Sequence, residues 1–234
     1  MARTKMTRHE LKEQDEITTS LQKFTEVAYS RKKEIITAAS ALLVVILAVL
    51  GWRLYAANRD ANAQSQLAHA ISAFNDPNVK TDKERYEKTL AEAQKTHDAY
   101  PSHTAGAIAL YYMGLSNDGL GNTAKATENL QQAIQSGDAQ VAGVAKFALA
   151  GLHKRHGDNQ KAIDLYKQLY ETGGYSKSAA VIELAKLSEA TNKIDDAKTY
   201  YQKIITEFPE SPFRQEADQA LKRLGVPPTE QKPS

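Results

Sequence analysis

Three stretches of this chain align with one another without gaps, and this internal repeat restricts the possible folds more than any other feature. The stretches cover residues 107–138, 143–174 and 178–209, at offsets of 36 and 35 residues. Four kinds of position recur in register: a central alanine (Ala126, Ala162, Ala197), a large residue four places on (Leu130, Tyr166, Tyr201), a small residue (Gly114, Ala150, Ala185) and a turn pair (Gly121-Asn122, Gly157-Asp158, Asn192-Lys193). A repeat of this length identifies one supersecondary unit used several times.

Each unit reads as helix–turn–helix. Small residues at fixed positions let two helices approach closely, and large residues fill the space beside them. Glycine or asparagine at the turn accepts the left-handed backbone that ends a helix. Because one unit cannot bury its apolar face alone, the units must stack. The sequence therefore predicts an all-α helical solenoid over residues 56–225.

Two flanking segments complete this solenoid. Residues 84–101 end in Tyr-Pro much as the third repeat ends in Phe-Pro, which predicts a degenerate opening half-repeat paired with a helix through residues 60–74. Residues 211–225 read as a capping helix, with Ser211 as N-cap and Gly225 as the stop. Residues 226–234 are expected to form a short disordered tail.

The repeat register resembles the tetratricopeptide repeat. Pro209 stands where that family has its closing proline, and Gly114 holds its small-residue position. The chain departs from the family pattern at the large aromatic of the first helix and at two of the closing prolines; the residues found there are Leu110, Lys146 and Val181, then Asp138 and Gly174. The resemblance implies stacked helix pairs whose first helices line a concave binding face.

An apolar run precedes the repeats. Residues 35–52 contain no charged side chain, and 18 helical residues rise about 27 Å, close to the roughly 30 Å of a bilayer core. Tyr29, Trp52 and Tyr55 flank the run, as aromatic side chains do at membrane interfaces. We expect a transmembrane anchor at residues 35–55. The alternative is a buried core helix of a soluble protein.

The anchor is expected to be retained and to point its N-terminus into the cytoplasm. Thirty-four residues precede the core, which is unlike a secretory signal, although residues 55–58 and 61–63 offer small residues for cleavage. Cations are far more numerous before the run than after it: Arg3, Lys5, Arg8, Lys12, Lys23, Arg31, Lys32 and Lys33 against Arg53 and Arg59. By the positive-inside rule, the repeats have crossed the membrane, which in a bacterium places them in the periplasm or at the cell exterior. We expect the periplasm, behind a single-pass inner-membrane anchor.

The leader, residues 1–34, has its own pattern. Ile17, Leu21, Phe24 and Ala28 fall at helical spacing within residues 16–30. This spacing predicts a short amphipathic helix that lies on the membrane surface or docks on a partner. A solvated leader without such a helix is the alternative.

The sequence offers little support for catalysis or for cofactor binding. The chain has no cysteine, which excludes disulfides and thiol catalysis, and its near-neutral exported part offers no footprint for nucleic acid. His153 and His156 are spaced for one metal, but no third ligand accompanies them in sequence, so we expect exposed turn histidines. His97 and His103 read as ordinary loop residues. We expect neither an enzyme nor a cofactor.

Surface recognition remains, and the tetratricopeptide resemblance implies where it occurs. The implied groove residues are Tyr111, Phe147 and Ile182, then Leu115, Gly151 and Lys186 one turn on, and Asp118, Lys154 and Glu189 at the rim. An apolar peptide segment or a partner helix would suit such a stripe. The alternative is that the large apolar members pack as core.

The whole layout resembles the YfgM-type ancillary subunits of the Sec translocon, most closely around residues 21–74 with "GWR" at 51–53. The resemblance implies a repeat domain that assists Sec-dependent export or hands exported proteins to periplasmic chaperones. Expected partners are translocon subunits, periplasmic chaperones or envelope proteins, together with membrane lipid around residues 35–55. The alternatives are a structural coordinator of envelope-assembly or cell-division complexes, and a self-associating scaffold that forms a homo-oligomer.

Overall fold

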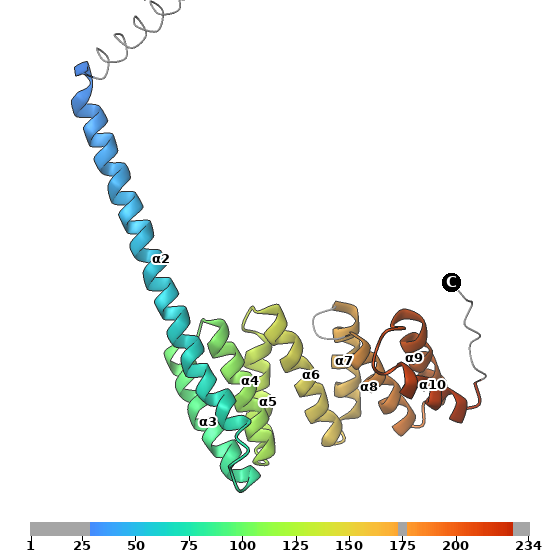
Figure 1. Cartoon of the computed structure of the whole chain (residues 1–234). Helices are drawn as coiled ribbons and strands as arrows, with labels where there is room; N and C mark the ends of the chain where they lie inside the picture. Colours follow the sequence, from blue (N-terminus) through green and yellow to red (C-terminus); the bar gives the residue numbers. More distant parts are fainter. Residues whose placement is uncertain (1–28, 173–176, 227–234) are drawn as a thin grey trace, which may run out of the picture. The chain divides into compact units, whose positions relative to one another are not determined.

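The computed structural model describes residues 29–172 and 177–226, and these residues form α-helices and no strand (Figure 1). The predicted leader helix within residues 16–30 lies almost wholly outside the described residues, as does the tail after residue 226. The chain divides into two compact units, residues 1–59 and 60–234. The first helix, α2 (Lys32–Phe74), contributes to both units.

In the first unit, α2 carries the apolar run. Within the part of the chain that the structure describes, α2 is the one helix that is long and apolar enough to cross a membrane, with a mean hydropathy of 2.5 over 18 residues. None of that stretch is buried against protein. Within the described structure, residues 35–52 therefore do not form a buried core helix.

The second unit is the helical solenoid. Residues 60–74 of α2 begin it, and the helices that follow are α3 (Asp82–Ala99), α4 (Thr104–Gly119), α5 (Thr123–Ile134), α6 (Ala139–Arg155), α7 (Asn159–Thr172), α8 (Lys177–Ala190), α9 (Ile194–Glu207) and α10 (Arg214–Arg223). Ala63 and Leu67 of α2 share a buried cluster with Ala93 of α3. The ring of Phe74 packs edge-on at 5.3 Å against Tyr112 of α4.

The repeat register is the packing register. The central alanines Ala126, Ala162 and Ala197 are each 0% exposed. The large residues four places on are buried as well: Leu130, Tyr166 and Tyr201. In the first repeat the approach of α4 to α5 requires glycine, because a Cβ at Gly114 would lie 2.6 Å from Leu130 Cγ. Small and large residues therefore interlock inside each pair, as their sizes indicate.

The three turns inside the helix pairs share one geometry. Gly121, Gly157 and Asn192 each have positive φ, at 76°, 81° and 60°. In each turn the next residue donates its N–H to a carbonyl five positions back: Asn122 to Asn117, Asp158 to His153 and Lys193 to Ser188. This hydrogen bond closes a Schellman motif, in which the left-handed residue satisfies the last carbonyls of the helix.

The capping helix α10 differs from its prediction at one end. Gly225 ends it with φ 76°, as expected. Ser211 is not its N-cap: the Ser211 hydroxyl accepts from the Phe213 N–H at 3.2 Å, and the helix begins at Arg214. The serine therefore belongs to a turn that precedes the helix, in which the Arg214 N–H also donates to the Ser211 carbonyl at 3.1 Å.

Candidate protein-interaction face

The predicted recognition residues lie on the first helices of the successive pairs. Tyr111 and Leu115 lie on α4, Phe147 and Lys154 on α6, and Lys186 on α8. All five are half-buried. Because residues at i, i+4 and i+7 share one side of a helix, Asp118, Gly151 and Glu189 continue the same stripes.

The structure corrects the predicted position of Ile182 in the groove. This residue is 1% exposed and belongs to the buried cluster that contains Ala217, Ala220 and Leu221 of α10. The final helix α10 contributes to the core that encloses it, so Ile182 acts as core and offers no surface to a partner. The apolar part of the stripe is thereby restricted to α4 and α6.

The two aromatic side chains of the stripe are held by neighbouring rings. Tyr111 packs edge-on against Tyr112 at 5.4 Å between centroids, and Phe147 packs edge-on against Tyr166 at 5.3 Å. Such contacts add to area burial and fix the orientation of both rings. Burial also raises the pKa of Tyr112 above its ordinary value. Tyr111 and Phe147 are therefore positioned before any partner arrives.

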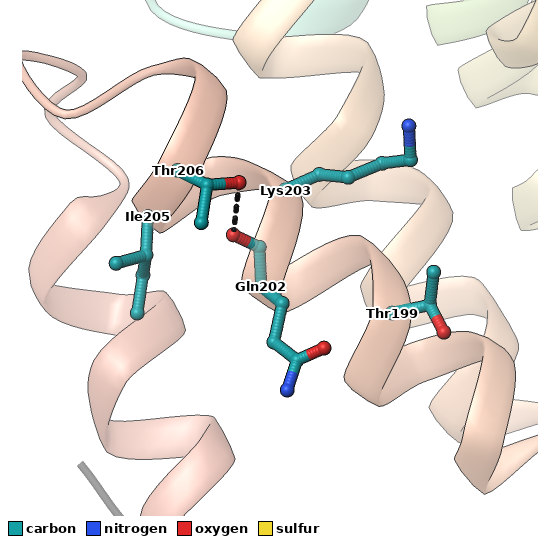
Figure 2. A pocket seen from close by; sticks show the side chains of 5 residues that line it. All are labelled: Thr199, Gln202, Lys203, Ile205 and Thr206. Carbon is teal, nitrogen blue, oxygen red and sulfur yellow. Dashed lines mark hydrogen bonds between the residues drawn. The ribbon is translucent and has the colours of Figure 1, made fainter. Parts of the chain in front are cut away.

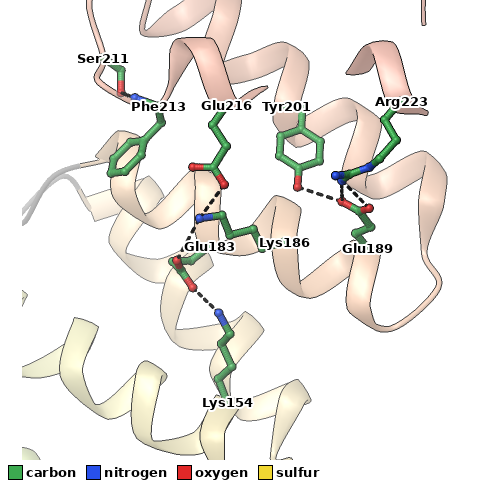
Figure 3. Close-up of polar contacts among 9 residues, drawn as sticks. All are labelled: Lys154, Glu183, Lys186, Glu189, Tyr201, Ser211, Phe213, Glu216 and Arg223. Atoms are coloured by element: carbon green, nitrogen blue, oxygen red, sulfur yellow. Dashed lines mark hydrogen bonds and ion pairs between the residues drawn. The ribbon is translucent and has the colours of Figure 1, made fainter. Parts of the chain in front are cut away.

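Ion pairs join the first helices to one another (Figure 3). Lys154 of α6 lies 2.6 Å from Glu183 of α8, and Glu183 also lies 4.0 Å from Lys186. Lys186 in turn pairs with Glu216 of α10 at 2.8 Å. Together these contacts form a chain of alternating charges that runs from α6 through α8 to α10.

A second group of contacts lies further along α8. Both carboxylate oxygens of Glu189 accept from Arg223 Nη2 of α10, at 2.6 and 2.8 Å, and the Tyr201 hydroxyl donates to Glu189 at 3.0 Å. Burial, followed by the hydrogen bond to Glu189, raises the pKa of Tyr201 far above its ordinary range. The hydroxyl therefore stays protonated and keeps its role as donor. On the preceding pair, Arg155 of α6 pairs with Asp118 of α4.

We call this surface the first-helix face. Its members are Tyr111, Leu115 and Asp118 of α4, Phe147, Gly151, Lys154 and Arg155 of α6, Glu183, Lys186 and Glu189 of α8, and Glu216 and Arg223 of α10. The sequence analysis did not include four of these residues among the expected groove positions: Arg155, Glu183, Glu216 and Arg223. The cross-pair contacts join residues 29 to 37 positions apart, from Lys154 and Glu183 at 29 to Arg155 and Asp118 at 37. A search for opposite charges at those separations could have found them.

His97, His103 and His153 take part in helix ends and turns, whereas His156, which follows α6, is exposed as expected. His153 is only 13% exposed at its side chain and lies 3.2 Å from Asp158, which corrects the expectation of an exposed histidine without a carboxylate. His103 is the N-cap of α4, accepting from the Ala105 N–H, and its Nε2 lies 3.0 Å from Asp60. His97 belongs to the last turn of α3. Among residues 29–172 and 177–226, no three His, Asp or Glu side chains are placed to hold a metal ion.

Three cavities of the repeat domain are lined by none of the residues of the first-helix face. One of about 400 Å³ is lined by Thr199, Gln202, Lys203, Ile205 and Thr206 of α9 (Figure 2). Another, of about 480 Å³, lies among α3, α4 and α5, and its wall includes Leu90, Met113 and Asn117. The third is formed by the loops before α4 and α6. Its wall includes His103 and Asp138, whose polar atoms have other partners: His103 caps α4 and lies 3.0 Å from Asp60, and Asp138 caps α6 and accepts from Thr104.

Comparisons with known proteins agree with this architecture. Two crystal structures of nearly identical TPR-like repeats from a putative Podosopora anserina kinesin light chain, one of them carrying a single substitution, are each 15% identical to the chain at a TM-score of 0.54. Each match covers 70% of this chain, and the two matches span 85% and 86% of the solved chains. At this identity the similarity establishes the fold alone. No curated protein sequence matches the chain at a significant level.

The model of the tetratricopeptide repeat-like domain family matches residues 29–225. The match begins before the apolar run, so it takes in α2 as well as the helix pairs. Helix pairs of this kind are protein–protein interaction modules. The chain belongs to the tetratricopeptide repeat-like domain family.

Proposed function

We propose that this protein is a membrane-anchored interaction module whose repeat domain binds other polypeptides through the first-helix face. One observation carries the proposal: on α4 and α6, the half-buried apolar side chains Tyr111, Leu115 and Phe147 share one stripe with polar residues that continue onto α8 and α10. A row of this kind gives a partner contacts on several repeats at once, and the neighbouring rings fix its aromatic members in advance.

The exposed apolar run of α2 supports the membrane anchor. Its large aliphatic side chains between Ile35 and Leu54 are each at least 45% exposed. In water such a surface is strongly unfavourable, since each Å² of apolar area costs about 25 cal/mol. Lipid removes that cost, and an α-helix satisfies its own backbone hydrogen bonds within the bilayer. The excess of cations before residue 35 supports a cytoplasmic N-terminus and a repeat domain on the opposite side.

The specific role that we propose is assistance to Sec-dependent export at the bacterial inner membrane, with hand-over of exported chains to periplasmic chaperones. The resemblance of residues 21–74 to YfgM-type translocon subunits supports this role. Two competing roles predict different partners. A coordinator of envelope assembly would have one defined partner, whereas a self-associating scaffold would have a second copy of this chain.

Photo-crosslinking from the first-helix face tests these roles. A photoreactive amino acid replaces Phe147 in the full chain in intact cells, and the same amino acid at Gln168, exposed on α7, serves as the control. We expect translocon subunits and several exported proteins among the Phe147 adducts and not among those of Gln168. One single envelope protein would establish the coordinator, and adducts with the chain itself would establish the scaffold. Equal adducts from both positions would refute the first-helix face as the binding surface.

The absence of cysteine from the sequence makes the topology directly measurable. Lys12→Cys places a thiol before the apolar run, and Gln132→Cys places one on the exposed side of α5. We expect a membrane-impermeant maleimide to label the Gln132→Cys protein in cells with a permeabilised outer membrane, and to label Lys12→Cys only after lysis. The reverse pattern would overturn the orientation. Release of the protein by alkaline carbonate, or a shortened chain, would overturn the retained anchor.

A further inference from the structure

The charges of the first-helix face neutralise one another. Four carboxylates, those of Asp118, Glu183, Glu189 and Glu216, meet four cations, those of Lys154, Arg155, Lys186 and Arg223. Every one of these contacts except Glu183–Lys186 bridges two different first helices. The charged part of the face is thus a set of alternating ion pairs that together carry no net charge.

We propose that the partner of this face is a segment of another polypeptide chain that carries apolar and amide side chains and no charge. This inference rests on the proposed function, and it specifies which polypeptide segments the face accepts. Alternating charges a few ångströms apart cancel at longer range, so the face does not steer a charged partner toward itself. Apolar contact then decides which segment stays bound.

The arrangement around Glu183 shows why either sign of charge is rejected. An incoming carboxylate would be attracted by Lys154 and Lys186, but Glu183 already occupies the position between them, at 2.6 and 4.0 Å. An incoming cation would approach Glu183 and be repelled by the same two lysines. In either case an existing ion pair must break before a new one forms, and the partner charge loses its hydration as well. A neutral segment avoids both costs.

The apolar part of the face supplies the attraction. Tyr111 and Leu115 of α4 and Phe147 of α6 are half-buried, and both rings are held edge-on by neighbouring tyrosines. Rings that are already ordered lose little conformational entropy on binding. Since Ile182 is buried in the core, this apolar part ends at α6. The bound segment therefore places its apolar residues across α4 and α6 and its amide or hydroxyl groups toward the ion pairs.

Three matched peptides test this inference against the full-length protein in lipid nanodiscs, with empty nanodiscs as the blank. The first is a fluorescent peptide of about ten Leu, Phe, Ser and Asn residues with blocked ends; the others replace two serines by aspartate or by lysine. We expect the neutral peptide to bind about tenfold more tightly than either charged one. We also expect its Kd to change less than about twofold between about 50 and 500 mM salt.

Two variants complete the test. Phe147→Ala is expected to weaken neutral-peptide binding about tenfold, in line with loss of a central aromatic anchor. Glu183→Gln keeps the side-chain shape but leaves Lys154 without its partner and gives the face one net positive charge. In that variant we expect the aspartate peptide to bind about fivefold more tightly than it binds the wild-type protein, with a salt dependence that the wild type lacks.

Every result that differs from these expectations overturns a stated part of the reasoning. If the wild-type protein prefers the aspartate or the lysine peptide, the inference about charge is overturned while the proposed binding face stands. If none of the three peptides binds, or if binding survives Phe147→Ala in a protein with unchanged circular dichroism, both the inference and the proposed face are overturned. An unchanged response to the aspartate peptide in Glu183→Gln would refute the role assigned to the ion pairs.

Discussion

Gly106→Ala tests how tightly the turn between α3 and α4 packs against α4. Gly106 is buried in the first turn of α4. A Cβ atom there would lie 2.0 Å from the Tyr100 carbonyl oxygen, 2.9 Å from the Tyr100 carbonyl carbon and 3.4 Å from Pro101 Cα. All three are backbone atoms, so no side-chain rotation can relieve the contact. The loop or the helix itself must move.

The expected effect is a balance of two terms. Overpacking of a closely packed site costs about 1–3 kcal/mol. Alanine gains up to about 1 kcal/mol over glycine in a helix. A Cβ only 2.0 Å from a backbone oxygen places the overpacking cost in the upper part of its range, about 2–3 kcal/mol. The net destabilisation is therefore about 1–2 kcal/mol, which lowers the Tm of a domain of this size by roughly 2–8 °C.

Gly151→Ala is the matched control, because it makes the same chemical change inside α6. There the new Cβ would meet Arg155 Nη1 at 3.4 Å and the Tyr166 hydroxyl at 3.8 Å, which are ordinary contacts. We expect the helix gain alone, a rise in Tm of up to about 4 °C. The measurement is thermal unfolding by circular dichroism of the full chain in detergent. Equal shifts in the two variants would refute the packing argument at Gly106.

Three further substitutions address polar groups of the repeat domain. Ser116→Ala removes a buried hydroxyl that has no hydrogen-bond partner, so we expect urea unfolding to show unchanged or slightly higher stability, and a loss above about 1 kcal/mol would contradict this. Tyr201→Phe removes the donor to Glu189 and should cost about 1–2 kcal/mol in the same assay, whereas Tyr200→Phe should cost less. The pKa of Asp138 is lowered, chiefly by the N–H of Val141 and the hydroxyl of Thr104, so its contribution to stability is fully present above about pH 4 and is lost as the pH falls toward the lowered value. Asp138→Asn, which keeps an acceptor at this N-cap, should therefore lose less stability than the wild type between pH 7 and pH 3; equal losses would contradict the assignment.

The fold could be predicted because its determinants are local. Ala162 and Tyr166 lie one helical turn apart, and the Gly157 turn is closed by a hydrogen bond between residues five positions apart. Such signals need no knowledge of the distant chain. The N-cap prediction for Ser211 was wrong for the same reason: a serine followed by proline is typical of a helix start, but the Ser211 hydroxyl accepts from the Phe213 N–H in a turn that precedes the helix.

The first-helix face could be predicted only in part, because its remaining contacts depend on the rotation between successive helix pairs. Helical spacing correctly places Phe147 and Lys154 on one side of α6. It cannot show that Ile182 is enclosed in the core with residues of α10, or that Lys154 reaches Glu183. Those facts follow from the pitch of the solenoid, which is the combined result of many contacts between helices. Gly106 escaped prediction similarly, since its constraint is set by the preceding loop.

The repeat position occupied by Leu130, Tyr166 and Tyr201 helps to determine where the first-helix face is polar. In the first repeat this position is Leu130, which ends inside the core against Gly114. In the second and third it is tyrosine. The Tyr166 hydroxyl lies near Gly151 of the face, and burial, then Glu183, raises its pKa above the ordinary range.

The Tyr201 hydroxyl in turn donates to Glu189. Because a phenol is longer than an isobutyl group and carries a donor, the Tyr201 side chain reaches Glu189 of α8, which a leucine at this position could not do. Replacing Tyr166 by Leu removes both its hydroxyl and the ring that holds Phe147 edge-on at 5.3 Å. We therefore expect weaker binding of the neutral peptide, and unchanged binding would show that Phe147 does not need this neighbour to be positioned.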